Sequence, residues 1–480
     1  MSLDSVIGMN QGGTRLPLST SGMVAVTIVL LLPSIALLLA GKTLLALAPI
    51  AAATCVIIVS HPRLAVYQYV FAIFIQWVLV DSIPLLLTDV AAALVILAAT
   101  LDLLVDHRLP LRFPRLTLNF AVLIAAVFVA GMVGSNPTIS LRVLARLTFL
   151  MLSFLSIYRL AGKSRIDTLV RVFFWVCVGH ALIVLGGFIA TGGGERSWGF
   201  SPMTFNALAM MTLPVATSLY LWHRKSGAVW YLLGTAVVLG GLISTQSRFS
   251  IIFALIMSLL VVILSWRYHR RLRAENRQSG FAMEQVRVSL RCRWLVIGAA
   301  GLTLAVIGLN PGMLQGVVDR FTVVLESPTG STVFLRLTLW SFALKAFLSD
   351  PLTGIGPGCF RSIHHILPTL SLSEVGPWVR GLSAHNLFLH YLAEAGLIGG
   401  ISLAALMINQ FRLSRRIWSS QVELQNRACT LALYATGTLF VVTTFLETGW
   451  LWGQGGYAFA FFVAMIARQH SRKVNAEAGD

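Results

Sequence analysis

Apolar runs of about twenty residues recur along the whole chain, separated by short polar or basic segments. A transmembrane helix needs roughly 20 mainly apolar residues, so the pattern predicts an all-α polytopic membrane protein with about 12–14 transmembrane helices. The first three runs are short and weakly separated, so some of them could be bent or re-entrant. We expect spans at residues 23–40, 44–60, 65–80, 84–104, 118–134, 141–158, 167–190, 203–222, 228–244, 250–266, 294–310, 387–410, 429–446 and 455–467.

Residues 311–386 form a long polar interruption of this pattern. The segment is too polar and too rich in turn residues for two further spans, although residues 334–348 have the helical periodicity of an interfacial helix. We therefore expect a single membrane domain, residues 1–480, in which the loop 311–386 is extracytoplasmic and carries part of the active site. The N-terminus carries one arginine before the first apolar run, which we interpret as the first helix and not as a removable signal.

Composition agrees with this class, because 57% of the 480 residues are hydrophobic and 11% are charged. Such a chain leaves no soluble domain of ordinary size. Cysteine spacing indicates neither a disulfide framework nor a metal cluster. We therefore expect no metal ion and no cofactor.

The net charge of +18 lies mainly in short loops, which argues against a nucleic-acid partner. With fourteen spans, every basic cluster falls on the same side of the membrane, and short basic loops stay cytoplasmic. The charge thus predicts a multi-pass protein with both termini cytoplasmic and a contact with anionic membrane lipids. The clusters lie at residues 108–115, 159–165, 224–225, 267–293, 412–427 and 468–473.

His385 and Asn386 close the long outer loop and open an apolar helix. A histidine at the mouth of a membrane helix can titrate near neutral pH, and ionisable residues at a membrane edge are functional candidates. The alternative is that such a histidine only caps the helix or lies at the interface.

Three arginines share the outer side with His385. Arg336 projects from the apolar side of the interfacial helix, where its charge needs an anionic partner, either a carboxylate of the loop or a ligand. Arg248 lies at the outer end of a span and could instead extend its charge to the interface. Arg196 lies in a glycine-rich loop, where pairing with Glu195 is the simpler interpretation.

These residues stand in short motifs that resemble the O-antigen ligase and polysaccharide polymerase superfamily. The resemblance covers roughly residues 196–410, and the first motif is the loosest match. The final motif is a His-Asn pair followed by nine residues, a glycine, two residues and a glycine. In chain order the motifs are Arg196-Ser197-Trp198-Gly199-Phe200-Ser201-Pro202, Thr245-Gln246-Ser247-Arg248, Arg336-Leu337-Thr338-Leu339-Trp340, Asp350-Pro351-Leu352-Thr353-Gly354-Ile355-Gly356, and His385-Asn386 with Gly396 and Gly399.

The resemblance implies a metal-independent, inverting membrane glycosyltransferase of the bacterial inner membrane. Its donor would be an undecaprenyl-pyrophosphate-linked oligosaccharide, and its acceptor a lipid or a glycan. Carried over to this chain, Arg248 and Arg336, with Arg196, would bind the pyrophosphate, and His385 would orient or deprotonate the acceptor hydroxyl. Asn386 and Glu394 would support the site. O-antigen or exopolysaccharide polymerisation and glycan ligation both remain open, and a polymerase would work beside a flippase and a chain-length regulator.

Other features of the sequence leave alternatives open. Gly354, Gly356 and Gly358 predict a turn, because no strand-then-helix context supports a nucleotide loop. Asp89 and Glu394 lie within spans, where they could relay protons or pair with Arg146. A transporter of a small solute or anion is therefore the second function class, and a non-catalytic scaffold the third.

Overall fold

The computed structural model describes residues 61–74, 78–80, 85–105, 113–162, 166–191, 204–222, 228–245, 247–275, 332–362, 381–419, 427–446, 448, 451 and 453–478. The spans expected at residues 23–40, 44–60 and 294–310 lie outside this part of the chain, as does Arg196.

The described part is almost entirely helical, as predicted. Seven of its helices, α5 to α9, α11 and α17, are long and apolar enough to cross a membrane. The chain is therefore a polytopic membrane protein. The helices are α4 (Leu64–Ile73), α5 (Leu87–Val105), α6 (Leu116–Val133), α7 (Pro137–Ala161), α8 (Ile166–Ala190), α9 (Thr204–Trp222), α10 (Ala228–Ser244), α11 (Arg248–Glu275), α14 (Thr332–Ser349), α17 (Leu387–Ser419), α18 (Arg427–Thr444) and α19 (Gly453–Ala478), with a short 3₁₀ helix, η2, at Phe360–Ser362.

Two of the expected spans end at other residues than predicted. The span expected at residues 65–80 ends as a helix at Ile73, and Val78–Val80 forms strand β1, antiparallel to β2 at Leu85–Leu86. The span expected at 387–410 begins correctly at Leu387 but continues to Ser419. Hydropathy marks where a chain leaves the membrane, whereas a helix continues as long as its backbone bonds are made.

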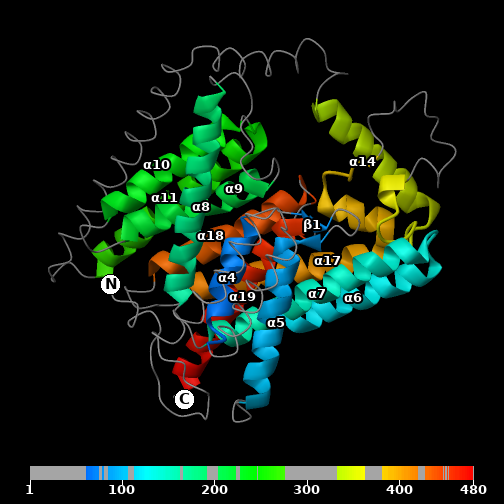
Figure 1. Cartoon of the computed structure of the whole chain (residues 1–480), viewed down its shortest axis with the longest axis horizontal. Coiled ribbons are helices and arrows are strands. Elements are labelled where there is room, and N and C mark those ends of the chain that lie inside the picture. The colour runs from blue at the N-terminus through cyan, green and yellow to red at the C-terminus, as the bar shows by residue number, and fades with distance from the viewer. Residues whose placement is uncertain are drawn as a thin grey trace, which may run out of the picture.

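The helices form two groups joined by a central pair (Figure 1). In one group α9 packs against α10 and α11, and in the other α17 packs against α6 and α14. α18 contacts both α9 and α17, and α19 contacts α7. Aromatic rings fill the centre, where Phe173 stacks on Phe461 with centroids 5.7 Å apart and Phe440 meets Phe459 edge-on at 4.9 Å.

Helix ends that adjoin loops assigned to the cytoplasm by the charge pattern contact one another. Arg159 Nε lies 3.1 Å from Oδ2 of buried Asp102, and Tyr158 shares a hydrogen bond with Ser471. The segments assigned to the opposite side also meet one another, and these contacts build the candidate site.

Candidate functional site

A break in α17 lies at the centre of the site. Gly396, with φ 60° and ψ −158°, interrupts the helical backbone between Leu387 and Ser419. A helix break leaves carbonyls without partners on one side and N–H groups without partners on the other. Within a membrane protein these groups must be satisfied internally, so the break needs a specific structural complement.

The segment that follows α14 supplies this complement. The N–H groups of Ile355 and Gly356 donate to the carbonyls of Ala393 and Glu394, at 2.9 and 3.0 Å. On the other side of the break, Leu397 N–H donates to the Pro351 carbonyl at 2.8 Å, and Ile398 N–H to the Leu352 carbonyl at 3.5 Å. The motif after α14 and the glycines of α17 are thus two halves of one backbone joint.

Glycine is required on both sides of this joint. A Cβ on Gly354, whose φ is +70°, would lie 2.5 Å from the carbonyl carbon of Glu394, and one on Gly396 would lie 2.2 Å from the Leu352 carbonyl oxygen. Gly354, Gly356 and Gly358 all have positive φ, so the segment is a turn, as the sequence predicted. Its function is close backbone packing.

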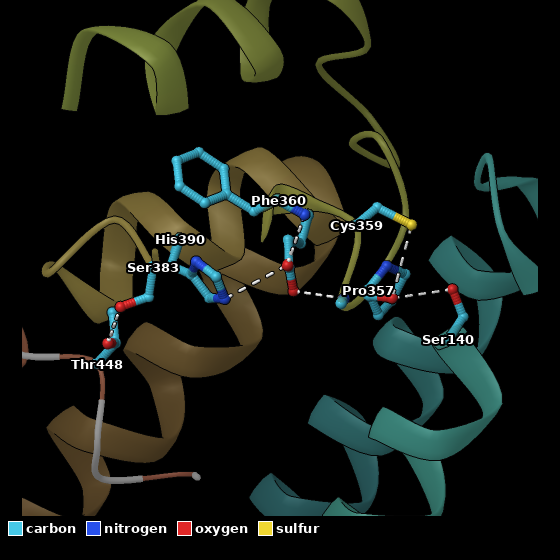
Figure 2. Close-up of polar contacts among 9 residues, drawn as sticks. Ser140, Pro357, Cys359, Phe360, Ser383, His390 and Thr448 are labelled. Atoms are coloured by element: carbon cyan, nitrogen blue, oxygen red, sulfur yellow. Dashed lines mark hydrogen bonds and ion pairs between the residues drawn. The ribbon is translucent and has the colours of Figure 1, made fainter. Parts of the chain in front are cut away.

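Glu394 fastens the turn from within α17. Its carboxylate is buried and accepts the N–H of Gly358 at 2.7 Å and the N–H of Phe360 at 3.0 Å. His390 Nε2 lies 3.4 Å from the same carboxylate, and its ring meets Phe360 edge-on (Figure 2). Arg146, which the sequence offered as a partner of Glu394, does not take part in these bonds.

The connection between α6 and α7, together with the first turn of α7, holds the turn from the opposite side. Ser135 donates its hydroxyl to the Ile355 carbonyl at 2.8 Å, and Ser140 donates to the Pro357 carbonyl at 3.1 Å, as Figure 2 shows for the second bond. The turn is therefore fixed between α7 and α17, and the end of α14 is fixed with it.

His385 and Asn386 introduce the first half of α17. Asn386 is buried and caps the helix, since its side-chain oxygen accepts the N–H of Leu389 at 2.9 Å. His385 is only partly buried and has a φ of 48°, a left-handed conformation that is uncommon outside glycine. Such backbone strain is concentrated at functional sites.

Arg336 is held from two other elements. Its guanidinium donates to the Leu446 carbonyl at 3.0 Å, just after α18, and lies over the ring of Phe249, 5.4 Å from the centroid, at the start of α11. Among the described residues its partners are thus a carbonyl and a ring, and no carboxylate neutralises it. Asp350, one carboxylate proposed for the pairing, instead accepts from the backbone and hydroxyl of Thr353.

The loop between α18 and α19 links the two groups. Leu446 binds Arg336, Phe388 packs near Phe445, and Thr448 shares a 2.7 Å hydrogen bond with Ser383, two residues before His385. Arg248 is the first residue of α11, directly before Phe249, whose ring lies beneath the Arg336 guanidinium. The structure therefore gathers the segments of Arg336, Arg248 and His385, while Arg196 lies outside the described residues.

Sequence reasoning missed the contribution of the α18–α19 loop. The group that binds Arg336 is the backbone carbonyl of Leu446, which leaves no signal in residue type. The capping role of Asn386 did have a signal, because asparagine before an apolar helical run is a preferred N-cap. Asp89 accepts a hydrogen bond from the Tyr457 hydroxyl, which places it in the helix packing.

Comparison with known families bears on the same stretch of chain. Residues 233–404 match the sequence family described as O-Antigen ligase. This segment is similar to that family and covers about a third of the chain. It contains Arg248, Arg336, the turn after α14 and the broken part of α17, so the joint described above lies within it. No curated protein matches the chain.

The O-antigen ligase family is one of membrane glycan ligases and polymerases, enzymes of the glycosyltransferase kind. Its substrates are a lipid-linked oligosaccharide and a glycan acceptor. In the present chain, α18 and α19 lie beyond the matched residues, yet their connecting loop contributes the carbonyl that binds Arg336.

Proposed function

We propose that this protein transfers or polymerises oligosaccharide from an undecaprenyl-pyrophosphate donor at the outer face of the bacterial inner membrane. It acts as an inverting glycosyltransferase that needs no metal ion, and both of its termini are cytoplasmic. Arg248 and Arg336, with Arg196, bind the pyrophosphate, and His385 serves the acceptor. Polymerase and ligase share this chemistry, and only a polymerase would be paired with a flippase and a chain-length regulator.

The observation that carries the proposal is the arrangement of Arg336. An arginine has five N–H donors, and among the described residues this guanidinium makes one hydrogen bond, to the Leu446 carbonyl. The remaining donors form a planar fork that suits two phosphate oxygens, and the charge is not cancelled by a carboxylate among the described residues. The same group lies over the ring of Phe249, next to the start of the helix whose first residue is Arg248.

The chemistry follows from these roles. The acceptor hydroxyl oxygen forms a bond to the anomeric carbon, from the face opposite the leaving group, while the bond from that carbon to the pyrophosphate oxygen breaks. The pyrophosphate leaves with the electron pair, and the arginines stabilise the charge that develops on it. The neutral imidazole of His385 takes the proton of the attacking hydroxyl.

The broken helix also bears on the transporter alternative. Transporters use the free backbone ends of discontinuous helices to bind solutes or ions near the middle of the membrane. In α17, carbonyls and N–H groups on both sides of Gly396 are bonded to residues 351–356 of the same chain. This break favours a rigid scaffold for the enzyme over a solute site.

Two substitutions test the proposal in a membrane transfer assay with lipid-linked donor. Arg336→Lys keeps the charge but loses the fork, so we expect turnover to fall at least about tenfold, the effect of losing one hydrogen bond to a charged group. Lys345→Ala is the matched control, because it removes an exposed cation from the same helix. His385→Ala should lower turnover about 10² to 10⁴-fold with donor binding retained.

The two variants can fail independently. Full activity of Arg336→Lys would show that the guanidinium fork is not used. Near-normal turnover of His385→Ala would exclude His385 as the general base. A modest loss of turnover with unchanged pH dependence would mean that His385 only orients the acceptor.

A further inference from the structure

Trp340 lies one helical turn after Arg336 in α14. Its indole Nε1–H is buried and has no hydrogen-bond acceptor in the part of the chain that the structure describes. An indole nitrogen is a donor only, and a buried donor without a partner is costly, so each one calls for an explanation. The residue is not used by the mechanism above.

Another tryptophan shows the ordinary arrangement. Trp222 is also buried, and its Nε1–H donates to the Ser265 hydroxyl at 3.1 Å, at the opposite end of the bundle. The two indoles therefore differ in whether the N–H has an acceptor. Within the described residues, the indole N–H of Trp222 has an acceptor and that of Trp340 has none.

The surroundings of Trp340 define what would complete it. Residues four apart project about 40° apart around a helix, so the indole lies on the same edge of α14 as Arg336. Leu339 and Ala343 project from the same side of that helix and are packed into the protein, so this edge faces inward. Among the described side chains of this edge, the polar groups are N–H donors, from the guanidinium and from the indole. A ligand that satisfies both must offer acceptor oxygens and carry negative charge.

We propose that Trp340 is a binding residue of the donor site, where its indole N–H donates to a phosphate oxygen of the lipid pyrophosphate that Arg336 grips. The inference rests on the proposed function and extends it by one residue. It also explains why an unsatisfied donor is retained beside a cation. The described part of the protein gives the N–H no acceptor, and the bound pyrophosphate supplies one.

This role predicts opposite effects on stability and on binding. Trp340→Phe keeps an aromatic ring and removes only the N–H with the smaller part of the indole. Without lipid, the variant should melt at the same temperature as the wild type or higher, because an unpaired buried donor is gone. Its affinity for pyrophosphate should fall about tenfold to a hundredfold, the range for a hydrogen bond to a charged group.

Trp222→Phe is the matched control with the reverse pattern. It removes an N–H that has a partner and leaves the Ser265 hydroxyl without its donor. Its melting temperature should fall, and its affinity for pyrophosphate should stay at the wild-type value. The pair of variants therefore separates a binding role from a packing role.

The experiment measures the melting temperature of the full-length protein in detergent, with and without a titration of undecaprenyl pyrophosphate. Wild-type binding with unchanged affinity in Trp340→Phe would overturn the inference and leave the proposed donor intact. A lower melting temperature of lipid-free Trp340→Phe, with wild-type affinity, would show that the indole serves packing alone. Absence of binding by the wild type would overturn the proposed donor and this inference with it.

Discussion

Replacing Gly396 with alanine tests whether the break in α17 is essential. The added Cβ would lie 2.2 Å from the Leu352 carbonyl oxygen and 2.3 Å from its carbon, well inside any normal contact. Both atoms belong to backbone, so no flexible side chain can move aside. Either the segment after α14 must withdraw or the break must change its geometry.

The cost has two parts that the structure makes explicit. A non-glycine residue at φ 60° and ψ −158° occupies a region used almost only by glycine, at about 1–3 kcal/mol. Withdrawal of residues 351–352 also weakens their hydrogen bonds to Leu397 and Ile398, each worth about 0.5–1.5 kcal/mol. We therefore expect a destabilisation of about 3 kcal/mol, large beside the usual effect of a point mutation.

A matched control comes from α8, where a Cβ on Gly179 would meet no atom within 4 Å. Gly179→Ala should be neutral or stabilise the helix by up to about 1 kcal/mol. Both variants are measured by their melting temperature in detergent and by glycan transfer in membranes. We expect Gly396→Ala to lose several degrees of melting temperature together with its activity, and Gly179→Ala to keep both.

The reasoning would be refuted by a clear result. If Gly396→Ala has the same melting temperature as Gly179→Ala and transfers glycan at the wild-type rate, the joint tolerates a side chain. The glycines of the final motif would then need an explanation other than backbone packing.

Three further predictions concern His385, the topology and Cys359. His385→Gly and His385→Ala should lose activity equally, but the glycine variant should be the more stable by about 1 kcal/mol because φ is +48°, and equal stability would argue against strain at this position. In cells whose envelope admits an impermeant thiol reagent, Leu352→Cys, at an exposed side chain, should be labelled before lysis and Cys292 only after it; the reverse order would invert the topology. Burial raises the pKa of the Cys359 thiol, so this outer cysteine should react slowly at neutral pH and faster as the pH rises.

The sequence predicted most of the described helices because their ends coincide with changes in polarity. Residues 228–244 were predicted with the bounds that α10 has, and the start of α17 at Leu387 was also correct. The basic residues beyond position 410 were interpreted as a loop, yet α17 continues through them to Ser419. The polarity pattern therefore predicted the membrane-spanning residues more reliably than the ends of the helices.

The joint itself could not be predicted, because its bonds are made by backbone groups of segments about forty residues apart. The glycines at 354 and 396 were each visible, but no pattern showed that Gly354 packs on the carbonyl carbon of Glu394. For the same reason Glu394 was offered a charged partner, whereas its carboxylate accepts backbone N–H groups. The spacing of nine residues between Asn386 and Gly396 now has a physical meaning, since it is the length of the first half of α17.

The joint between the turn and α17 also sets rules for exchanging parts between related enzymes. A chimera that takes α14 and the turn after it from one parent and α17 from another would have to reproduce a fit in which the backbone of the turn touches the backbone of α17 without side chains between them. The unit of exchange is therefore residues 332–419 as a block. It must be transferred together with Ser135 of the α6–α7 connection, Ser140 of α7, and Leu446 and Thr448 of the α18–α19 loop. A transplant limited to the recognisable motifs would include the candidate site residues but not the backbone contacts that position them.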